Sequence, residues 1–409
     1  MRALPRKLLT ATLSASLAAL AAFAGWRALR PPPADTVVLV DDSEAFAELL
    51  RERQAEQPPE PPPAPSAFEP PAGEFPDGYP PPLIRKEFDE ELAKRFYGAL
   101  RKPGQYHFHP QAHLWAAPDY RGRRTFPEHP DGGWTARTNG AAIRKDVEVR
   151  DVPPDLRVLV CGDSHTAGLV PNSESYANVL EELLAESDPA RSFEVLNAGI
   201  GGTSMYDYLG VLEFLEPELR PQVLVVGFYG GNDFLGGMRM YHYFYRLPPP
   251  ESGPRGGSAL TAVGSVGPVA QSIAQVAFFL DNPDDLPHAR AFVDTLTVEI
   301  ARRCEESGIH PVFMYIPPAN SAQPDLYAAM FAEPLAALDI TWEDLSSTDR
   351  LAAQWLAFLE YRGFDHVDLT PIFRASREPC FWFTDLHINT HGHRLAAEAL
   401  LPLVAAVGR

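Results

Sequence analysis

From residue 156 onward, short apolar segments alternate with segments of helical spacing, and this alternation constrains the fold more than any other feature. Leu156–Cys161 is continuously apolar, as expected for a strand that helices cover on both faces. Further predicted strands are Phe193–Asn197, Val223–Phe228, Pro311–Ile316 and His366–Leu369. The predicted helices are Tyr176–Ala185, Tyr206–Leu215, Ala289–Glu306 and His391–Leu401, the last ended or kinked by Pro402. This pattern predicts an α/β fold with a mostly parallel sheet and helices on both of its faces.

The chain before this alternation has a different character. Phe88–Leu100 has helical spacing, whereas Tyr106–Trp115 and Trp134–Arg144 are aromatic and β-prone, with turns rich in Gly and Pro between them. We therefore expect a small β-rich extension ahead of the α/β body.

The N-terminus has the pattern of an export signal. Arg2, Arg6 and Lys7 precede an apolar run of 19 residues at Leu8–Trp26. This length is at the border between a signal peptide and a membrane anchor, which needs about 17–25 residues. Of the 25 residues from Pro58 to Pro82, 12 are proline, which favours an extended, semi-rigid spacer. The predicted organisation is a signal peptide or membrane anchor (1–26), a Pro-rich linker (27–85), a β-rich N-terminal extension (86–153) and a catalytic domain (154–409) with an insertion at 235–288.

Charge and cysteine content exclude several classes of protein. With 35 Lys and Arg against 54 Asp and Glu, the net charge is −19, so a nucleic-acid partner is not expected. The three cysteines, Cys161, Cys304 and Cys380, form no CxxC pair, which argues against a disulfide scaffold and a Cys-rich zinc site. Cys161, inside an apolar strand, is expected to be a buried small hydrophobic residue.

Reactive side chains and glycines follow the predicted strands. Ser164 comes just after the first strand, a Gly-rich stretch from Asn197 to Ser204 after the second, and Asn232 after the third, while His387 precedes the last helix. The carboxyl ends of parallel strands meet at one edge of a sheet, so one cleft could collect all four blocks.

These residue types suit acyl transfer. A serine hydroxyl is a poor nucleophile until a histidine accepts its proton, and a carboxylate beside that histidine fixes its tautomer. We predict Ser164 as the nucleophile, His387 as the base and Asp385 as the carboxylate. Attack on an ester places negative charge on oxygen, and the backbone N–H groups of Ser164 and Gly202 and the side-chain amide of Asn232 are the predicted donors to it.

The four blocks, Gly162-Asp163-Ser164, Asn197-x-Gly199-x-Gly201-Gly202, Gly230-Gly231-Asn232-Asp233 and Asp385-x-His387, together resemble the SGNH (GDSL-type) hydrolase superfamily over about residues 155–409. The resemblance implies a flavodoxin-like three-layer sandwich, a Ser-His-Asp triad, and esterase or O-acetyltransferase chemistry that uses no metal or organic cofactor. Thr138-Asn139 and Ile143-Arg144 are similar to a T-N-x-x-G-φ-R segment of exported bacterial members, with Ala142 in place of its glycine.

The chain departs from the superfamily pattern at two positions. His165 stands where the serine block usually has leucine. The acid usually lies three residues before the histidine, where this chain has Thr384, and Asp385 lies only two before His387. If the Asp385 carboxylate points away, a backbone carbonyl could orient the imidazole instead.

Other interpretations of these residues are open. Ser164 could cap a helix, Asn232 and Asp233 could form a plain turn, and the glycines could suggest a dinucleotide loop, although Ser204 replaces the third glycine of that motif. Two histidine groups could suggest zinc, but the HExxH spacing is absent; they are His387, His391 and His393, and His107, His109 and His113. A predicted loop after the third block carries aromatic residues that could stack on sugars, line an acyl pocket or pack under the insertion: Tyr241, Tyr243, Phe244 and Tyr245.

The sequence thus predicts a serine esterase that is exported to the periplasm or cell exterior and that contacts a membrane only through its N-terminal segment. The expected substrate is an acyl ester, with acetyl favoured, on an O-acetylated polysaccharide. One alternative is an O-acetyltransferase of cell-surface glycans, in which a sugar hydroxyl replaces water. Another is a non-catalytic glycan-binding or scaffold protein with the same fold. The sequence makes no prediction of oligomeric state.

Overall fold

Five parallel strands form the centre of the structure, which is a computed structural model that describes residues 80, 82–83, 89–101, 104–244, 253–264 and 267–407. The strands lie in the order β6, β5, β7, β8, β9, and each pairs in parallel with its neighbours. Their bounds are β5 Leu156–Gly162, β6 Phe193–Asn197, β7 Val223–Tyr229, β8 His310–Ile316 and β9 Asp365–Asp368. In chain order this arrangement reads 2-1-3-4-5, the flavodoxin-like order, and the predicted parallel sheet is confirmed.

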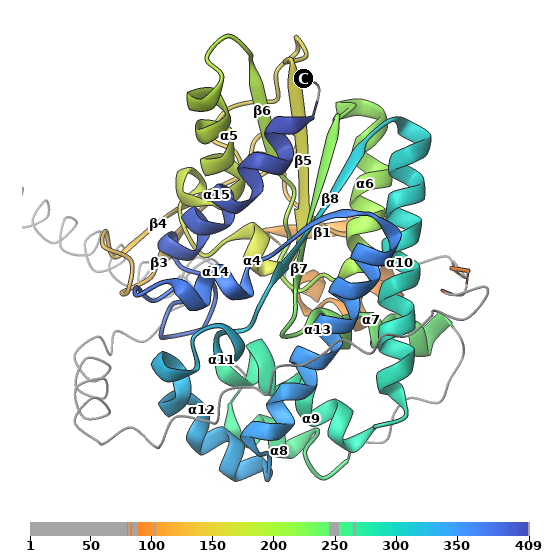
Figure 1. Ribbon diagram of the computed structural model, residues 1–409, viewed down its shortest axis with the longest axis vertical. Helices are drawn as coiled ribbons and strands as arrows, with labels where there is room; N and C mark the ends of the chain where they lie inside the picture. The colour runs from red at the N-terminus through yellow and green to blue at the C-terminus, as the bar shows by residue number, and fades with distance from the viewer. Residues whose placement is uncertain are drawn as a thin grey trace, which may run out of the picture. The chain divides into compact units, whose positions relative to one another are not determined.

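Helices cover both faces of the sheet, as Figure 1 shows. Side chains alternate across each strand: Val158 and Val160 pack with α5 and α15, while Leu159 and Cys161 pack in the cluster that includes α6 and α10. The result is a three-layer α/β sandwich.

The helices that follow β5 along the chain are α4 Ser164–Ala167, η2 Asn172–Glu174, α5 Tyr176–Ser187, α6 Met205–Leu219, α7 Asp233–Phe244, α8 Ser258–Val263, the π-helical turn η3 Val269–Ile273, α9 Ala274–Asp281, α10 Asp285–Ser307, α11 Ala319–Ala322, α12 Pro324–Leu338, α13 Trp342–Arg362, α14 Thr370–Ala375 and α15 Thr390–Ala406.

Two sequence predictions within the body are wrong. The segment after the third block is not a loop, because α7 begins at Asp233 and includes Tyr241. Glycine makes this helix possible: a Cβ on Gly236 would lie 2.7 Å from Ser204 Cβ, so only a residue without a side chain lets α7 approach so closely. Of the two outcomes predicted at Pro402, an end or a kink, the end is wrong, because α15 continues to Ala406.

The N-terminal extension contributes a helix and two hairpins. They are α3 Glu90–Phe96 with the 3-10 turn η1 Gly98–Arg101, the antiparallel pair β1 Tyr106–His109 and β2 His113–Ala116, and the pair β3 Arg121–Thr125 and β4 Gly133–Arg137. Of the β-prone stretch predicted at Trp134–Arg144, only its first four residues are strand. Leu114 and Trp115 belong to the same buried cluster as α6 and α10, so the extension shares a hydrophobic core with the body.

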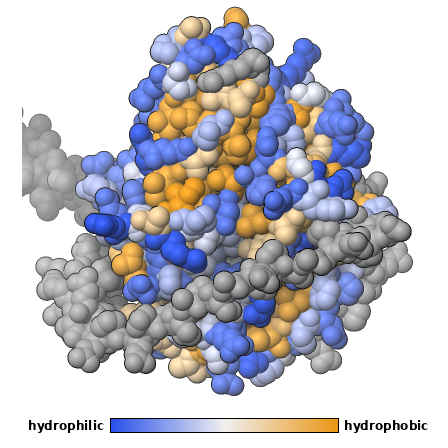
Figure 2. Space-filling view, viewed as in Figure 1, coloured by the Kyte–Doolittle hydropathy of each residue, from blue (hydrophilic) through white to orange (hydrophobic). Residues whose placement is uncertain are grey.

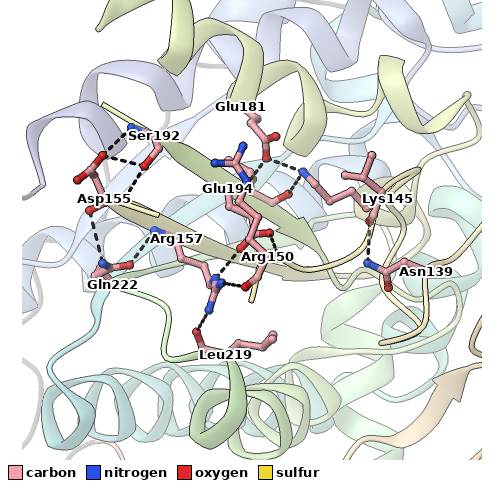
Figure 3. Close-up of polar contacts among 12 residues, drawn as sticks. Asn139, Lys145, Arg150, Asp155, Arg157, Glu181, Ser192, Glu194, Leu219 and Gln222 are labelled. Atoms are coloured by element: carbon pink, nitrogen blue, oxygen red, sulfur yellow. Dashed lines mark hydrogen bonds and ion pairs between the residues drawn. The ribbon is translucent and has the colours of Figure 1, made fainter. Parts of the chain in front are cut away.

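Buried charges also join the extension to the sheet, as Figure 3 shows. Arg157 of β5 pairs with Glu194 of β6 at 2.6 Å, and Glu194 accepts the backbone N–H of Arg150. The Arg157 guanidinium also donates to the carbonyls of Arg150 and Leu219. A buried ion pair is tolerated when its remaining donors and acceptors are hydrogen-bonded. Here the backbone of Arg150, in the extension, provides some of those hydrogen bonds.

The predicted signal peptide or anchor and all but three residues of the predicted linker lie outside the described residues. Within the ranges that the structure does describe, no helix is both long and apolar enough to cross a membrane. On the face in Figure 2, apolar residues gather where α15 runs, and Leu395, Leu401 and Leu403 of this helix are only partly buried.

Candidate active site

Ser164 and His387 lie side by side at the carboxyl end of the sheet. Ser164 is the first residue of α4, directly after β5, and His387 belongs to residues 380–389 between α14 and α15, here called the histidine segment. The Oγ of Ser164 lies 2.8 Å from Nε2 of His387. A second acceptor, Oδ2 of Asp163, lies farther from the Ser164 hydroxyl, at 3.4 Å. The Ser164 hydroxyl therefore lies closer to the imidazole than to this carboxylate.

The structure places Asp385 beside the same imidazole. Its Oδ2 lies 3.1 Å from Nδ1 of His387, and its Oδ1 accepts the backbone N–H of His387 at 3.0 Å. The carboxylate is close enough for an ion pair, but it lies off the direction in which an Nδ1–H bond would point. Such contacts often tighten only when substrate is bound. Thr384, at the position where the acid was expected from the resemblance, is exposed.

The Gly-rich stretch after β6 forms the wall beside Ser164. A Cβ on Gly201 would lie 3.4 Å from Ser164 Cβ, and the N–H of Ile200 donates to the carbonyl of Gly162. Gly202 is exposed and has φ +83°, a conformation that favours glycine. Open space surrounds the place of a Cβ on Gly202, so the backbone angle, and not close approach, requires glycine here.

Asn232 and Asp233 follow β7 on the other side of Ser164. Asn232 is half-buried, and its carbonyl accepts the N–H of Gly236 in the first turn of α7. Asp233 is buried and accepts the N–H of Tyr229 and the hydroxyl of Tyr208. The pair therefore starts a helix instead of forming a plain turn.

Two buried carboxylates lie beneath the site. Burial raises the pKa of Asp163 to about 6, against the lowering effect of the His165 N–H that it accepts. Burial and the charge of Asp163 raise the pKa of Asp233 well above its usual value. Ionisation of these two carboxyl groups is therefore unfavourable, and each stays protonated to a higher pH than an exposed carboxyl group would.

His165 is the position at which this chain departs from the GDSL pattern, and it packs directly against His387. Its ring stacks between Tyr229 (3.6 Å between centroids) and His387 (4.6 Å). Nε2 lies 3.0 Å from Oε1 of Gln271, and Nδ1 faces the backbone N–H of Ile388 at 3.4 Å. Burial holds the pKa of His165 well below its usual value, so this ring is neutral.

Sequence reasoning missed Gln271 because it lies in the predicted insertion, where no motif marks it. It belongs to the π-helical turn η3, and its side-chain nitrogen lies 3.5 Å from Nε2 of His387. Single π-helical turns are often found at functional sites. Its contact with the histidine segment depends on the tertiary fold and has no signal in the sequence.

Four of the histidines considered as zinc ligands make other contacts, and these are His391, His393, His109 and His113. Nδ1 of His393 accepts the N–H of Tyr176, and His391 lies 2.9 Å from the hydroxyl of Ser376. In the extension, His109 accepts backbone N–H groups and His113 contacts Asp207. The described ranges contain no cluster of three or more His, Cys, Asp or Glu side chains that could hold a metal ion.

The other residues singled out in the sequence lie outside the contact between Ser164 and His387. Cys161 is fully buried, and burial raises the pKa of its thiol. The ring of Tyr241 stacks on that of His288, with 5.2 Å between ring centroids. Tyr245 lies outside the described residues. The Arg144 guanidinium donates to the carbonyls of Gly168 and Val170, so it fixes the segment after α4. Ala142 has φ +61°, which explains why the related pattern has glycine there.

Comparison with known proteins gives a family and a set of distantly similar structures. Residues 160–395 match the model of the GDSL-like Lipase/Acylhydrolase family, which is more than half of the chain. A search of curated proteins finds none that matches.

Three similar solved structures illustrate the structural comparison. TesA has 16% sequence identity and a TM-score of 0.36, with 60% of this chain and 96% of that chain covered. An α/β hydrolase from the metagenome of Lake Arreo, Spain, has 15% identity and a TM-score of 0.38, with 63% and 99% covered. An acetylxylan esterase from Geobacillus stearothermophilus has 13% identity and a TM-score of 0.36, with 62% and 96% covered.

Proposed function

The chain belongs to the GDSL-like lipase/acylhydrolase family and is an ester-hydrolysing enzyme, and we propose that it works through an acyl-enzyme formed on Ser164. The observation that carries this proposal is the 2.8 Å contact between Ser164 Oγ and His387 Nε2, across 223 residues of sequence. A serine hydroxyl in contact with an imidazole is the arrangement that makes it nucleophilic at neutral pH.

The proposed reaction has two halves. Ser164 Oγ attacks the ester carbonyl while its proton passes to Nε2 of His387, and Asp385 stabilises the imidazolium that forms. The oxyanion accepts hydrogen bonds from the N–H groups of Ser164 and Gly202 and from the Asn232 amide. When the intermediate collapses, His387 returns the proton to the leaving alcohol. Water then attacks the acyl-enzyme with His387 as base, which releases the acid and restores Ser164.

The experiment that tests this reaction is covalent trapping. A fluorophosphonate probe, followed by peptide mapping, should label Ser164 in the wild-type protein. Ser164→Ala and His387→Ala should each lower the hydrolysis of p-nitrophenyl acetate by about 10³-fold or more. Labelling of another residue, or a wild-type rate in Ser164→Ala, would contradict the assignment.

We further propose that the substrate is an acetyl ester on a polysaccharide outside the cytoplasm. The N-terminal pattern supports the location: basic residues precede an apolar run, and a Pro-rich spacer that could hold a catalytic body away from a membrane or wall follows. The proposed substrate class follows from that location. Fusion of residues 1–85 to alkaline phosphatase, which is active only after export, tests the location. Incubation with O-acetylated polysaccharide should release acetate, whereas transfer of acetyl to an added glycan would identify an O-acetyltransferase.

A further inference from the structure

The turn between β3 and β4, residues 126–132, contacts the histidine segment through the side chain of Glu128. Oε2 of Glu128 accepts the backbone N–H of Phe383 at 2.7 Å. Oε1 accepts both the backbone N–H and the hydroxyl of Thr384. One carboxylate from the extension therefore holds two consecutive residues that lie directly before Asp385.

His129, the neighbouring residue of this turn, contacts Glu174, which in turn contacts the residue that follows the histidine segment. Nε2 of His129 lies 3.1 Å from Oε2 of Glu174, and the same carboxylate accepts the hydroxyl of Thr390 at 2.6 Å. Thr390 is the first residue of α15, three positions after His387. The turn thus contacts the histidine segment directly just before the imidazole, and it reaches the first residue after that segment through Glu174.

Aromatic packing fixes the turn against the same segment. Phe126 packs on Trp382 in an edge-to-face contact with 5.2 Å between ring centroids, and Trp134 belongs to the same small buried cluster. Trp382 in turn donates its backbone N–H to the carbonyl of His387 at 2.8 Å. This packing fixes the turn that carries Glu128, so the hydrogen bonds of Glu128 have a defined direction.

Glu128 also brings a second carboxylate close to Asp385. Burial raises the pKa of Glu128, the N–H groups of Phe383 and Thr384 lower it, and the charge of Asp385 raises it again. The three donors of the histidine segment offset part of the cost of placing like charges together. Hydrogen bonds that offset such a cost also restrict where residues 383 and 384 can lie.

We propose that Glu128 is a positioning residue for the base, so that the N-terminal extension forms part of the active site of this enzyme. The proposal rests on the proposed roles of Ser164 and His387. Glu128 acts by fixing Phe383 and Thr384, and through them the direction from which Asp385 and His387 enter the site. A base displaced by about 1 Å can cost about 10²-fold in rate, so this restraint bears directly on kcat.

The test compares Glu128→Gln and Glu128→Ala with the wild-type full chain, using p-nitrophenyl acetate. Gln keeps the length and one acceptor oxygen, whereas Ala keeps neither. We expect kcat to fall in the order wild type, Glu128→Gln, Glu128→Ala, with a loss of about 10-fold to 10²-fold for Ala. KM should stay within about threefold of wild type, because the change affects the base and not the bound ester.

Glu148→Ala is the matched control, since Glu148 also lies in the extension and accepts one backbone N–H, that of Gly140, at 2.9 Å. Its kcat should equal that of wild type. An unchanged kcat in both Glu128 variants, an equal loss in Glu148→Ala, or an effect confined to KM would overturn the proposal. If Glu128→Ala does not fold, Glu128→Gln alone decides between a lowered and an unchanged kcat. A wild-type protein without esterase activity or fluorophosphonate labelling refutes the proposed function instead.

Discussion

Asp385 reaches the imidazole of His387 across a single residue because Leu386, between them, has φ +62°. This left-handed conformation turns the chain so that one carboxylate meets both the backbone N–H and the ring of His387. Leucine rarely adopts it, and the cost of about 1–2 kcal/mol is offset by the nearly complete burial of Leu386. The short Asp-x-His spacing is therefore compatible with an acid in contact with the base.

Asp385→Asn should lower kcat/KM by about 10²–10⁴-fold, because an amide cannot stabilise the imidazolium that forms during attack. Hydrolysis of p-nitrophenyl acetate measures the effect. Asp365→Asn is the matched control, since Asp365 also contacts a histidine, His310, at 2.8 Å, on the surface. Equal rates for Asp385→Asn and Asp365→Asn would show that another group orients His387.

Asn232→Ala should reduce kcat by about 10²–10³-fold with little change in KM, because the lost donor acts on the oxyanion of the transition state. Asn282→Ala provides a comparison, since the Asn282 side chain donates to the carbonyl of Phe278 at the end of α9. A wild-type kcat for Asn232→Ala would remove Asn232 from the oxyanion site.

Asp163→Asn should change how stability depends on pH. The pKa of Asp163, about 6, is raised above its usual value near 3.8, so its stabilising contribution is present below pH 3.8 and is lost as the pH rises through 6. Asn cannot ionise and still can accept the His165 N–H. Relative to wild type, the free energy of unfolding of the variant should therefore rise between pH 4.5 and pH 8, on the order of 1–3 kcal/mol. Urea unfolding at the two pH values measures it, and a difference independent of pH would refute the prediction.

Asp339→Gly should stabilise the protein by up to about 1 kcal/mol, because Asp339 ends α12 with φ +52° and its exposed carboxylate loses a 3.8 Å surface ion pair with Arg255 that contributes little. Gly363, which ends α13 with φ +66°, provides the converse: no atom lies within 4 Å of a Cβ there, so Gly363→Ala should destabilise through the backbone alone. Thermal unfolding of both variants measures the shifts. Shifts of the same sign would contradict this explanation.

The sheet could be predicted because its central strands β5 and β7 are buried along their whole length and form continuous apolar runs, as Leu156–Cys161 does. Ser164, Gly202, Asn232 and His387 could be selected because each stands just after a strand or before the last helix, where a parallel sheet gathers its loops. Helix α7 was missed because Gly236 and Gly237 weaken helical propensity locally, while contact with Ser204 and packing on α10 favour the helix.

The contacts of Glu128 and Gln271 could not be predicted from the sequence. Each is an ordinary polar residue in a segment without a motif, and each meets the histidine segment only after the chain has folded. The same is true of the left-handed angle at Leu386, since nothing in the spacing Asp385-Leu386-His387 indicates it. Long-range contacts and unusual backbone angles depend on the tertiary structure.

The shared core of the extension and the α/β body has a practical consequence for protein engineering. A truncated protein that begins at residue 154 would lack Leu114 and Trp115, which pack in one buried cluster with α6 and α10. The apolar surface exposed by their removal would favour self-association. The smallest fragment that folds and turns over substrate should therefore reach back at least to α3, well ahead of the family match that starts at residue 160.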